Sequence, residues 1–128
     1  MSAQCDTSGS GRCSPKPKLP KRPLLDADQA GKLAGVFAIL ANDTRLRLLH
    51  ALVRAGELSV TALADTVEMK PQAISNQLQR MTDRGIVGSR RDGTSIIYRI
   101  VDPCVATLLD RGWCLSEDAG ERTSSPKK

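Results

Sequence analysis

The sequence predicts a mainly α-helical domain with one small β-hairpin, in the order α-α-α-α-β-β-α. Apolar residues recur every three or four positions through most of the segment 24–118, which is typical of helices with one buried face. After residue 85 this spacing gives way to two short runs around an Asp-Gly pair, which is typical of a hairpin. Aromatic residues make up only 2% of the chain, so the core must consist of Leu, Val, Ile and Ala, and this composition favours packed helices.

The chain has 128 residues, enough for one small domain. We expect the folded domain over residues 24–118, between a disordered basic arm at 1–23, rich in Ser, Gly, Pro and Lys, and a disordered tail at 119–128. No run of about 18 apolar residues is present, which predicts that no segment spans a membrane. The polar N-terminus lacks the apolar segment of a signal peptide, so we expect a cytoplasmic protein whose four cysteines are thiols.

Two helices are expected at the start of the domain. The first runs from about Ala27 to Ala41. Asn42 then interrupts the pattern and is a good N-cap for a second helix over 43–55, with Gly56 as its C-cap. The first helix carries an apolar stripe of Leu33, Val36, Phe37 and Leu40, and the second places Leu46, Leu49, His50 and Val53 on one face.

A short helix, a tight turn and a further helix follow. Ser59 can cap the third helix, and a turn at 68–70 leads to Pro71, which suits the first turn of a fourth helix. The fourth helix extends to about Asp83 and is ended by Gly85. This arrangement is a helix-turn-helix. Its expected buried positions are Val60, Leu63, Ala64 and Val67 in the third helix and Ile74, Leu78 and Met81 in the fourth.

A hairpin follows the helix-turn-helix directly. Residues 86–91 and 95–100 have the pattern of two strands, and Asp92-Gly93 between them is a strong turn signal. Asp102-Pro103 then opens a last helix, which we expect to end at about Leu115. A hairpin in this position is a wing, so the sequence predicts a winged helix-turn-helix.

The outward face of the fourth helix carries short, amide and basic side chains, which are the types that enter a major groove and contact base edges. Amides such as Gln72 and Asn76 can pair with adenine, and basic or hydroxyl groups on the wing can hold phosphates. Any one of these residues could simply be solvated, but helix, wing and arm together favour double-stranded DNA as the partner. The candidate DNA-binding residues are Lys70, Gln72, Ala73, Ser75, Asn76, Gln79, Arg80, Arg90, Arg91, Thr94 and Arg99.

Most of the excess positive charge lies in the arm. The whole chain has a formal net charge of +5, of which residues 1–23, with five basic residues and one acidic residue, hold +4. Residues 24–115 hold 11 basic and 10 acidic residues, a net +1. A basic arm suits an anionic partner such as nucleic acid, although a solvated tail that keeps the chain soluble would have the same composition.

Several segments, in this order, resemble the ArsR/SmtB family of small, dimeric, winged-helix repressors. The likeness spans about residues 30–116 and rests on LANDTRLRLL at 40–49, GELSV at 56–60, KPQAISNQL at 70–78 and RRDGTSIIY at 90–98. The resemblance implies a homodimer joined through the first and last helices. It also implies binding to an operator near the protein's own promoter, and an inducer that weakens this binding.

Two positions depart from the family's pattern. The family often has two histidines where this chain has Asn76 and Gln77, so the preferred bases are expected to differ. Ser59 stands where some members carry a metal-binding cysteine, so we assign no metal site to the third helix.

Cys104 and Cys114 are the natural ligands for an inducer, because thiolates bind soft metals most strongly. Ten positions separate them, about 15 Å along one helix, so a single chain cannot bring both to one ion. Two antiparallel copies, related by a two-fold axis at Leu109, would place Cys104 of one level with Cys114 of the other. Asp102 and Glu117 would flank the same place.

The family's metal site on the last helix is similar. It begins Asp-x-His, which Asp102-Pro103-Cys104 matches with Cys for His, and its second half would fall on Leu115 and Asp118. Two cysteines of the arm, Cys5 and Cys13, can join such a site. Three thiolates would suit arsenite, cadmium or lead as the inducer, and added carboxylates would suit zinc or cadmium.

Other functions fit parts of the sequence. Cys104 and Cys114 could form a redox or reactive-sulfur switch, or pack as small apolar residues at a dimer face. A winged helix that binds only protein is a third hypothesis. An enzyme is not expected, because the sequence has no Cys–His pair, no Gly-rich phosphate loop and only one histidine. We expect no organic cofactor.

Overall fold

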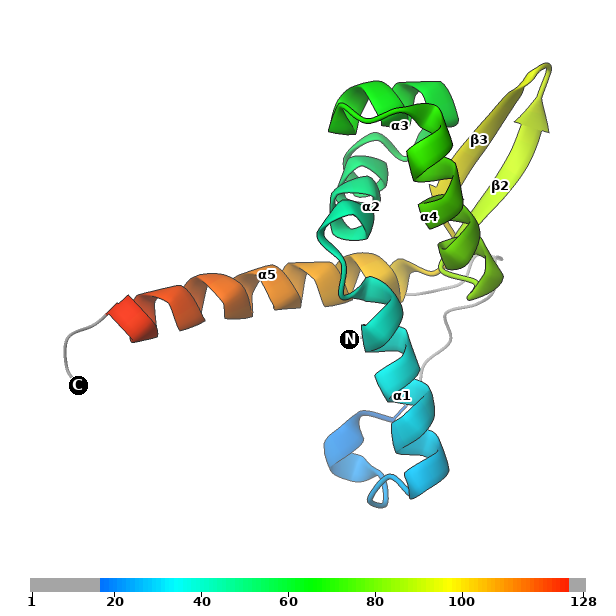
Figure 1. Ribbon diagram of the computed structural model, residues 1–128. Coiled ribbons are helices and arrows are strands. Elements are labelled where there is room, and N and C mark those ends of the chain that lie inside the picture. The colour runs from blue at the N-terminus through cyan, green and yellow to red at the C-terminus, as the bar shows by residue number, and fades with distance from the viewer. Residues whose placement is uncertain (1–16, 125–128) are drawn as a thin grey trace.

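The structure is a computed structural model and describes residues 17–124. Its order of elements confirms the winged helix-turn-helix (Figure 1). Three helices gather beside the sheet, whereas the first and last helices project from this body (Figure 1). The elements are a short 3-10 helix Leu19–Lys21, α1 Ala27–Leu40, α2 Asp43–Ala55, β1 Glu57–Ser59, α3 Val60–Val67, α4 Pro71–Asp83, β2 Val87–Asp92, β3 Ser95–Ile100 and α5 Pro103–Ser124.

Local chemistry fixes the start of each helix where the sequence predicts it. The side-chain oxygens of Asn42, Ser59 and Asp102 accept backbone N–H groups in the first turns of α2, α3 and α5. Pro71 is the first residue of α4. A backbone N–H at this position has no acceptor within the helix, so the lack of an N–H in proline costs no hydrogen bond. These caps satisfy donors that a helix start otherwise leaves unpaired, and so they set the boundaries.

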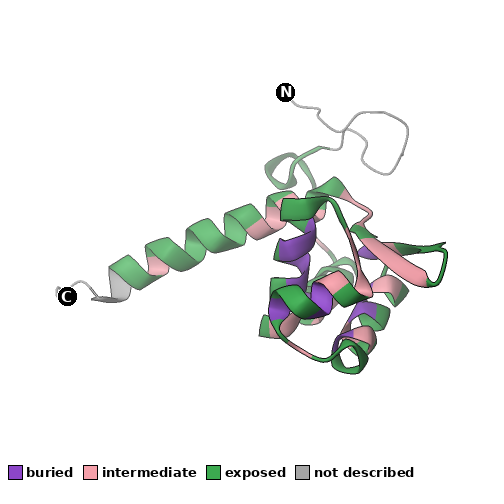
Figure 2. Cartoon of the chain, turned by 90° about the horizontal axis from the view of Figure 1, so that it is seen from above, coloured by how far each residue is buried: buried purple, intermediate pink, exposed green. Residues whose placement is uncertain are grey.

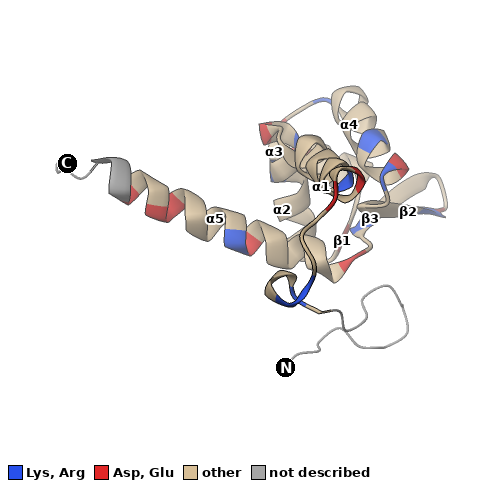
Figure 3. Ribbon diagram, turned by 90° about the horizontal axis from the view of Figure 1, so that it is seen from below, with Lys and Arg blue, Asp and Glu red and all other residues tan. Residues whose placement is uncertain are grey.

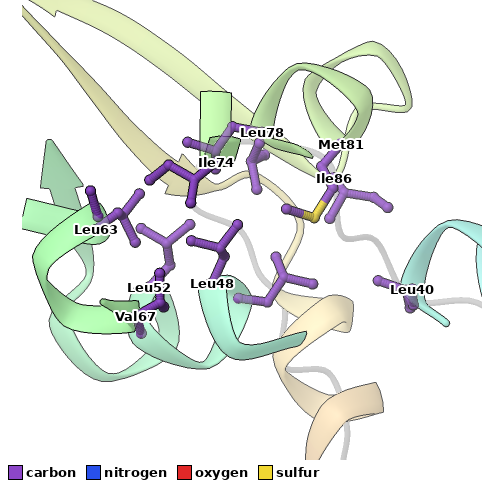
Figure 4. Packing of buried hydrophobic residues seen from close by; sticks show 13 residues of the cluster. Leu40, Leu48, Leu52, Leu63, Val67, Ile74, Leu78, Met81 and Ile86 are labelled. Carbon is purple, nitrogen blue, oxygen red and sulfur yellow. The ribbon is translucent and has the colours of Figure 1, made fainter. Parts of the chain in front are cut away.

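One apolar cluster holds α2, α3 and α4 together (Figure 4). Ile74, Leu78 and Met81 of α4 are fully buried, as predicted. No polar or charged residue is buried anywhere in the described part of the chain. The core is Leu40, Leu48, Leu49, Ala51, Leu52, Leu63, Ala64, Val67, Ile74, Leu78, Met81, Ile86 and Val87.

The buried face of α2 differs from the face that the spacing favoured. Leu46, His50 and Val53 are exposed, and the helix turns its other leucines toward α3 and α4. Apolar residues occupy several sides of this helix, so spacing alone could not tell which side its neighbours would cover. The buried residues of α2 are Leu48, Leu49, Ala51 and Leu52.

The wing belongs to a three-stranded antiparallel sheet of order β1-β3-β2. The sequence did not predict β1, whose three residues pair with the far strand of the hairpin. The hairpin turn also lies one residue later than expected, because Asp92 pairs with Ser95 and leaves Gly93 and Thr94 as the loop. Gly93 has a φ of 65°, a conformation that glycine adopts without strain.

Helix α5 is longer than predicted. We expected it to end near Leu115, with a disordered tail at 119–128, but it continues to Ser124, so the expectation is wrong for 119–124. Beyond Asp110 almost every described residue of α5 is exposed (Figure 2). This half of the helix buries no face, so the sequence has no apolar stripe there from which its end could be predicted. Residues 125–128 lie outside the described residues.

The predicted arm is described only in part. Residues 1–16, which include Cys5 and Cys13, lie outside the described residues. The described remainder holds the short 3-10 helix and is exposed throughout. Within residues 17–124, no helix combines the length and apolar character needed to cross a membrane.

Truncating the inner face of α4 should destabilise the whole domain. Leu78 is completely buried, so Leu78→Ala should lower the free energy of unfolding by about 2–5 kcal/mol, the cost of lost burial plus a cavity. Urea denaturation followed by circular dichroism measures this. Leu24→Ala is the control, since Leu24 is 95% exposed and should change the unfolding free energy little. Equal effects of the two substitutions would contradict the packing described above.

Candidate nucleic-acid interface

Helix α4 divides sharply into an apolar and a polar face. Ile74, Leu78 and Met81 point into the core, and the opposite side is open to solvent. Of the candidate base-reading residues only Ser75 is half-buried. The exposed candidates on and before this helix are Lys70, Gln72, Ala73, Asn76, Gln79 and Arg80.

Two amides on α4 are already engaged within the chain. Gln79 donates a hydrogen bond from Nε2 to Oδ1 of Asp83, 2.8 Å away on the same helix. Gln77 is half-buried and accepts a hydrogen bond from Nε of Arg45 at 2.6 Å. Of the two positions where the family often has histidine, Asn76 alone is exposed. Asn76 is therefore the candidate for any direct difference in base preference.

The wing arginines lie on opposite faces of the sheet. Arg90 pairs with Ile97, and Arg99 pairs with Glu57, so Arg90, Arg99 and Glu57 share one face. Arg91 lies on the other face, which it shares with Val87, a core residue beside α4. Arg91 is thus on the same side of the wing as the helix that would enter the groove.

Arg90 is already engaged by a carboxylate of the same chain, that of Glu57. The two form a salt bridge, with Nη2 of Arg90 donating to Oε1 of Glu57 at 2.7 Å. This hydrogen bond lowers the pKa of Glu57 and raises that of Arg90. Within residues 17–124, Arg91 and Arg99 form no salt bridge. Glu57 therefore competes with any phosphate for Arg90, whereas Arg91 has no such competitor.

The charges of the described residues are unevenly placed. Figure 3 shows basic residues on α4 and the wing strands and mainly acidic ones on the outer half of α5. An acidic rod repels phosphates, while basic groups attract them. The side of the molecule that holds α4 and the wing is accordingly the one suited to DNA.

The cysteines of α5 are exposed and well separated along one continuous helix. Asp102 accepts a hydrogen bond from the backbone N–H of Cys104 at 2.9 Å. The thiol of Cys114 donates to Oδ2 of Asp118 at 3.9 Å, so Asp118 and not Glu117 is the carboxylate in contact with it. In the described part of the chain, no three His, Cys, Asp or Glu residues come together as a metal site.

The projecting helices carry large apolar side chains that the chain leaves exposed. Phe37 of α1 is 50% exposed, and Trp113 and Leu115 of α5 are 64% and 62% exposed. Leu33 and Val36 of α1 are also exposed. Exposed apolar surface of this kind marks an interaction site.

Comparison with known proteins places the chain in a family. Residues 40–90 match the sequence family described as a helix-turn-helix domain. The transcriptional regulator NmtR of Mycobacterium tuberculosis is 40% identical over 93 residues, which cover 73% of this chain and 77% of that protein. The chain belongs to the ArsR/SmtB family of transcriptional repressors.

Two solved structures extend the comparison. The crystal structure of the AntR antimony-specific transcriptional repressor is 56% identical, covers 86% of this chain and 99% of its own, and has a TM-score of 0.72. The homodimeric winged helix-turn-helix domain of Mb0332 from Mycobacterium bovis is 32% identical, covers 75% of this chain and 88% of its own, and has a TM-score of 0.67. An ArsR/SmtB repressor acts on DNA, so α4 and the wing form the candidate interface.

Arg91 and Gln72 should contribute to this interface in different ways. Arg91→Ala should weaken binding to every duplex and lower the slope of log affinity against log salt by about 1, because one phosphate contact is lost. Gln72→Ala should instead change the sequence preference, because Gln72 is exposed on α4, the recognition helix that would enter the major groove. Fluorescence anisotropy on specific and random duplexes at several salt concentrations separates the two. Equal losses on all sequences from both variants would contradict this division.

Releasing Arg90 should strengthen DNA binding. Glu57→Gln removes the carboxylate that holds Arg90, so affinity for random duplex should rise a few-fold and the salt slope should steepen by about 0.9 per added phosphate contact. Arg90→Ala in the natural background should matter less than Arg91→Ala. The same anisotropy titrations measure both effects. An unchanged affinity and slope in Glu57→Gln would show that the salt bridge does not compete with phosphate.

Proposed function

We propose that this repressor leaves its operator when a trivalent metalloid or another soft ion binds thiolates of α5. The observation that carries the proposal is that Cys104 and Cys114 are both exposed on this helix, each beside a carboxylate. Thiolates are the preferred ligands of soft ions. The likeness to AntR, an antimony-specific repressor, supports Sb(III) and its lighter congener As(III) as the inducers to test first.

The proposal includes a homodimer joined through α1 and α5. A second copy would cover Phe37, Trp113 and Leu115, which a single chain leaves in water. An isologous pair with antiparallel α5 helices would form two equal sites, each with Cys104 of one protomer and Cys114 of the other. The homodimeric domain of Mb0332 supports a homodimer. We place the dimer in the cytoplasm, together with the DNA that it binds.

The continuity of α5 constrains this site. The helix is unbroken through Gly112, so Cys104 and Cys114 differ in direction by about 80° around its axis. The shared ion would therefore lie to one side of the helix pair. A thiolate of the arm, from Cys5 or Cys13, is our candidate for a third ligand, and three thiolates suit As(III), Cd(II) or Pb(II). Asp102 and Asp118, with Glu117 nearby, would favour Zn(II) or Cd(II).

A titration of the reduced, metal-free protein tests the proposal. Sb(III), As(III), Cd(II), Pb(II) and Zn(II) are added while ultraviolet absorption follows thiolate charge transfer and fluorescence follows Trp113, the single tryptophan, next to Cys114. We expect stoichiometric, tight binding that Cys104→Ser and Cys114→Ser each abolish. Ser116→Ala, an exposed neighbour on the same helix, is the control and should bind as the natural chain does.

DNA release is measured in the same samples by anisotropy on the operator. The ion that binds tightest should also lower operator affinity, and it should do so only in variants that retain both thiols. Absence of tight binding for all five ions would overturn the proposal. In that case a disulfide-linked dimer after mild oxidation, seen on a non-reducing gel, would favour the redox switch, because about 15 Å along one helix precludes a disulfide within a chain.

A further inference from the structure

Helix α1 is joined to the body near its C-terminal end, by apolar contacts of Ile39 and Leu40 and by two arginine hydrogen bonds. Of its residues only Leu40, the last, is buried. Nη1 of Arg45, on α2, donates to the carbonyl oxygen of Ile39 at 3.0 Å. Nη2 of Arg84, just after α4, donates to the carbonyl oxygen of Gly35 at 3.4 Å. The carbonyl of Ile39 is among the last four of α1, which lack partners within the helix, and an arginine near this negative end is favourable.

Arg45 also contacts α4, the recognition helix, through a second nitrogen of the same guanidinium group. Its Nε donates to Oε1 of Gln77 at 2.6 Å, while Nη1 holds Ile39. Both hydrogen bonds are partly buried, so water competes with them less than it would on the surface. The guanidinium is a rigid planar fork, so the positions of its two acceptors are coupled. Arg45 thus links the end of α1 to the middle of α4.

Arg45 itself is firmly placed. It lies in the first turn of α2, where its backbone N–H donates to Oδ1 of Asn42 at 3.0 Å. Asn42 is the N-cap that separates α1 from α2. The side chain that joins α1 to α4 therefore starts from a fixed point between the two helices.

The apolar face of α4 decides which side of the helix is buried, and the Arg45–Gln77 hydrogen bond adds a directional constraint on its exact rotation. Ile74, Leu78 and Met81 pack against other aliphatic side chains, and apolar burial has little directional preference. A hydrogen bond weakens steeply when its angle departs from linear. Gln77 neighbours the exposed Asn76 in sequence, so a turn of α4 that moves one moves the other. The rotation decides which amides face the base edges.

We propose that Gln77 and Arg45 are positioning residues that determine DNA sequence specificity without contacting DNA. The Arg45–Gln77 hydrogen bond sets the rotation of α4 relative to α1. Gln72 and Asn76 then reach the base edges in one register. Loss of this bond lets α4 rotate, and the protein then discriminates less between its preferred sequence and random DNA while it still binds phosphates.

Two variants of Gln77 separate this role from a structural one. Gln77→Met keeps the length of the side chain and removes the acceptor, whereas Gln77→Glu keeps an acceptor for Arg45. The probes are the duplex that the natural chain enriches from a randomised pool and a random duplex of equal length. For Gln77→Met the ratio of the two affinities should fall about tenfold, the equivalent of one hydrogen bond to a charged group. For Gln77→Glu the ratio of the two affinities should remain unchanged, even though the added negative charge weakens binding to both duplexes.

The hydrogen bond has its own spectroscopic signature. In the natural chain and in Gln77→Glu, the Nε–H of Arg45 should give an NMR signal protected from exchange with water, and in Gln77→Met this signal should be lost. This measurement decides the contact even if Gln77→Met has a lower melting temperature.

Three results would overturn the proposal. An unchanged affinity ratio in a folded Gln77→Met would show that the bond does not control specificity. An equal loss in both variants would show that Gln77 contacts a base itself. An Arg45 Nε–H signal that exchanges freely with water in the natural chain would show that the hydrogen bond to Gln77 does not form. Failure of the natural chain to enrich any duplex would overturn DNA reading as a whole, and is a separate outcome.

Discussion

The structure depends on a core that is too small to cover the first and last helices along their length. Leucine, isoleucine, valine, methionine and alanine from the end of α1, from α2, α3 and α4, and from the start of the sheet fill it, and no polar or charged group is buried there in residues 17–124. The core fixes α4 with its polar face outward. It contacts α1 only near Ile39 and Leu40 and α5 only in its first half, and both helices present apolar residues to solvent. The same shortage of core thus exposes the polar face of α4 on one side and leaves apolar surface on the projecting helices, where we propose that a second copy binds.

Arginines make several of the polar contacts outside the core, and the role of each arginine depends on its position. Arg45 and Arg47 of the TRLR segment donate to carbonyls of Ile39 and Val67, and so tie α2 to the ends of α1 and α3. Arg90 is held by a carboxylate, while Arg91 lies on the side of the recognition helix. Residues 24–115 hold almost balanced charge, so within this segment attraction to DNA would depend on where the arginines lie rather than on how many there are.

The sequence predicted those features that are decided within a few residues. Caps at Asn42 and Ser59 and the proline at 71 are local signals, and the helices begin there. Strand β1 was missed because its three residues become a strand only by pairing with residues about 40 positions away. The end of α5 was missed because an exposed helix has no apolar stripe. The inward turn of Gln77 was missed because its partner lies 32 residues away in sequence.

The length of α5 has a consequence for the DNA that the protein can address. Its 22 residues correspond to about 33 Å of helix. Successive major grooves on one face of B-DNA are about 34 Å apart. In the dimer proposed above, with its two-fold axis at Leu109, only residues 103–115 of the two helices overlap, so the helix starts that carry the DNA-binding bodies lie about 18 Å apart along α5 and the rest of each helix projects beyond the pair. The register of this pairing, together with the width of each body, would then set the spacing between the two half-sites of the operator.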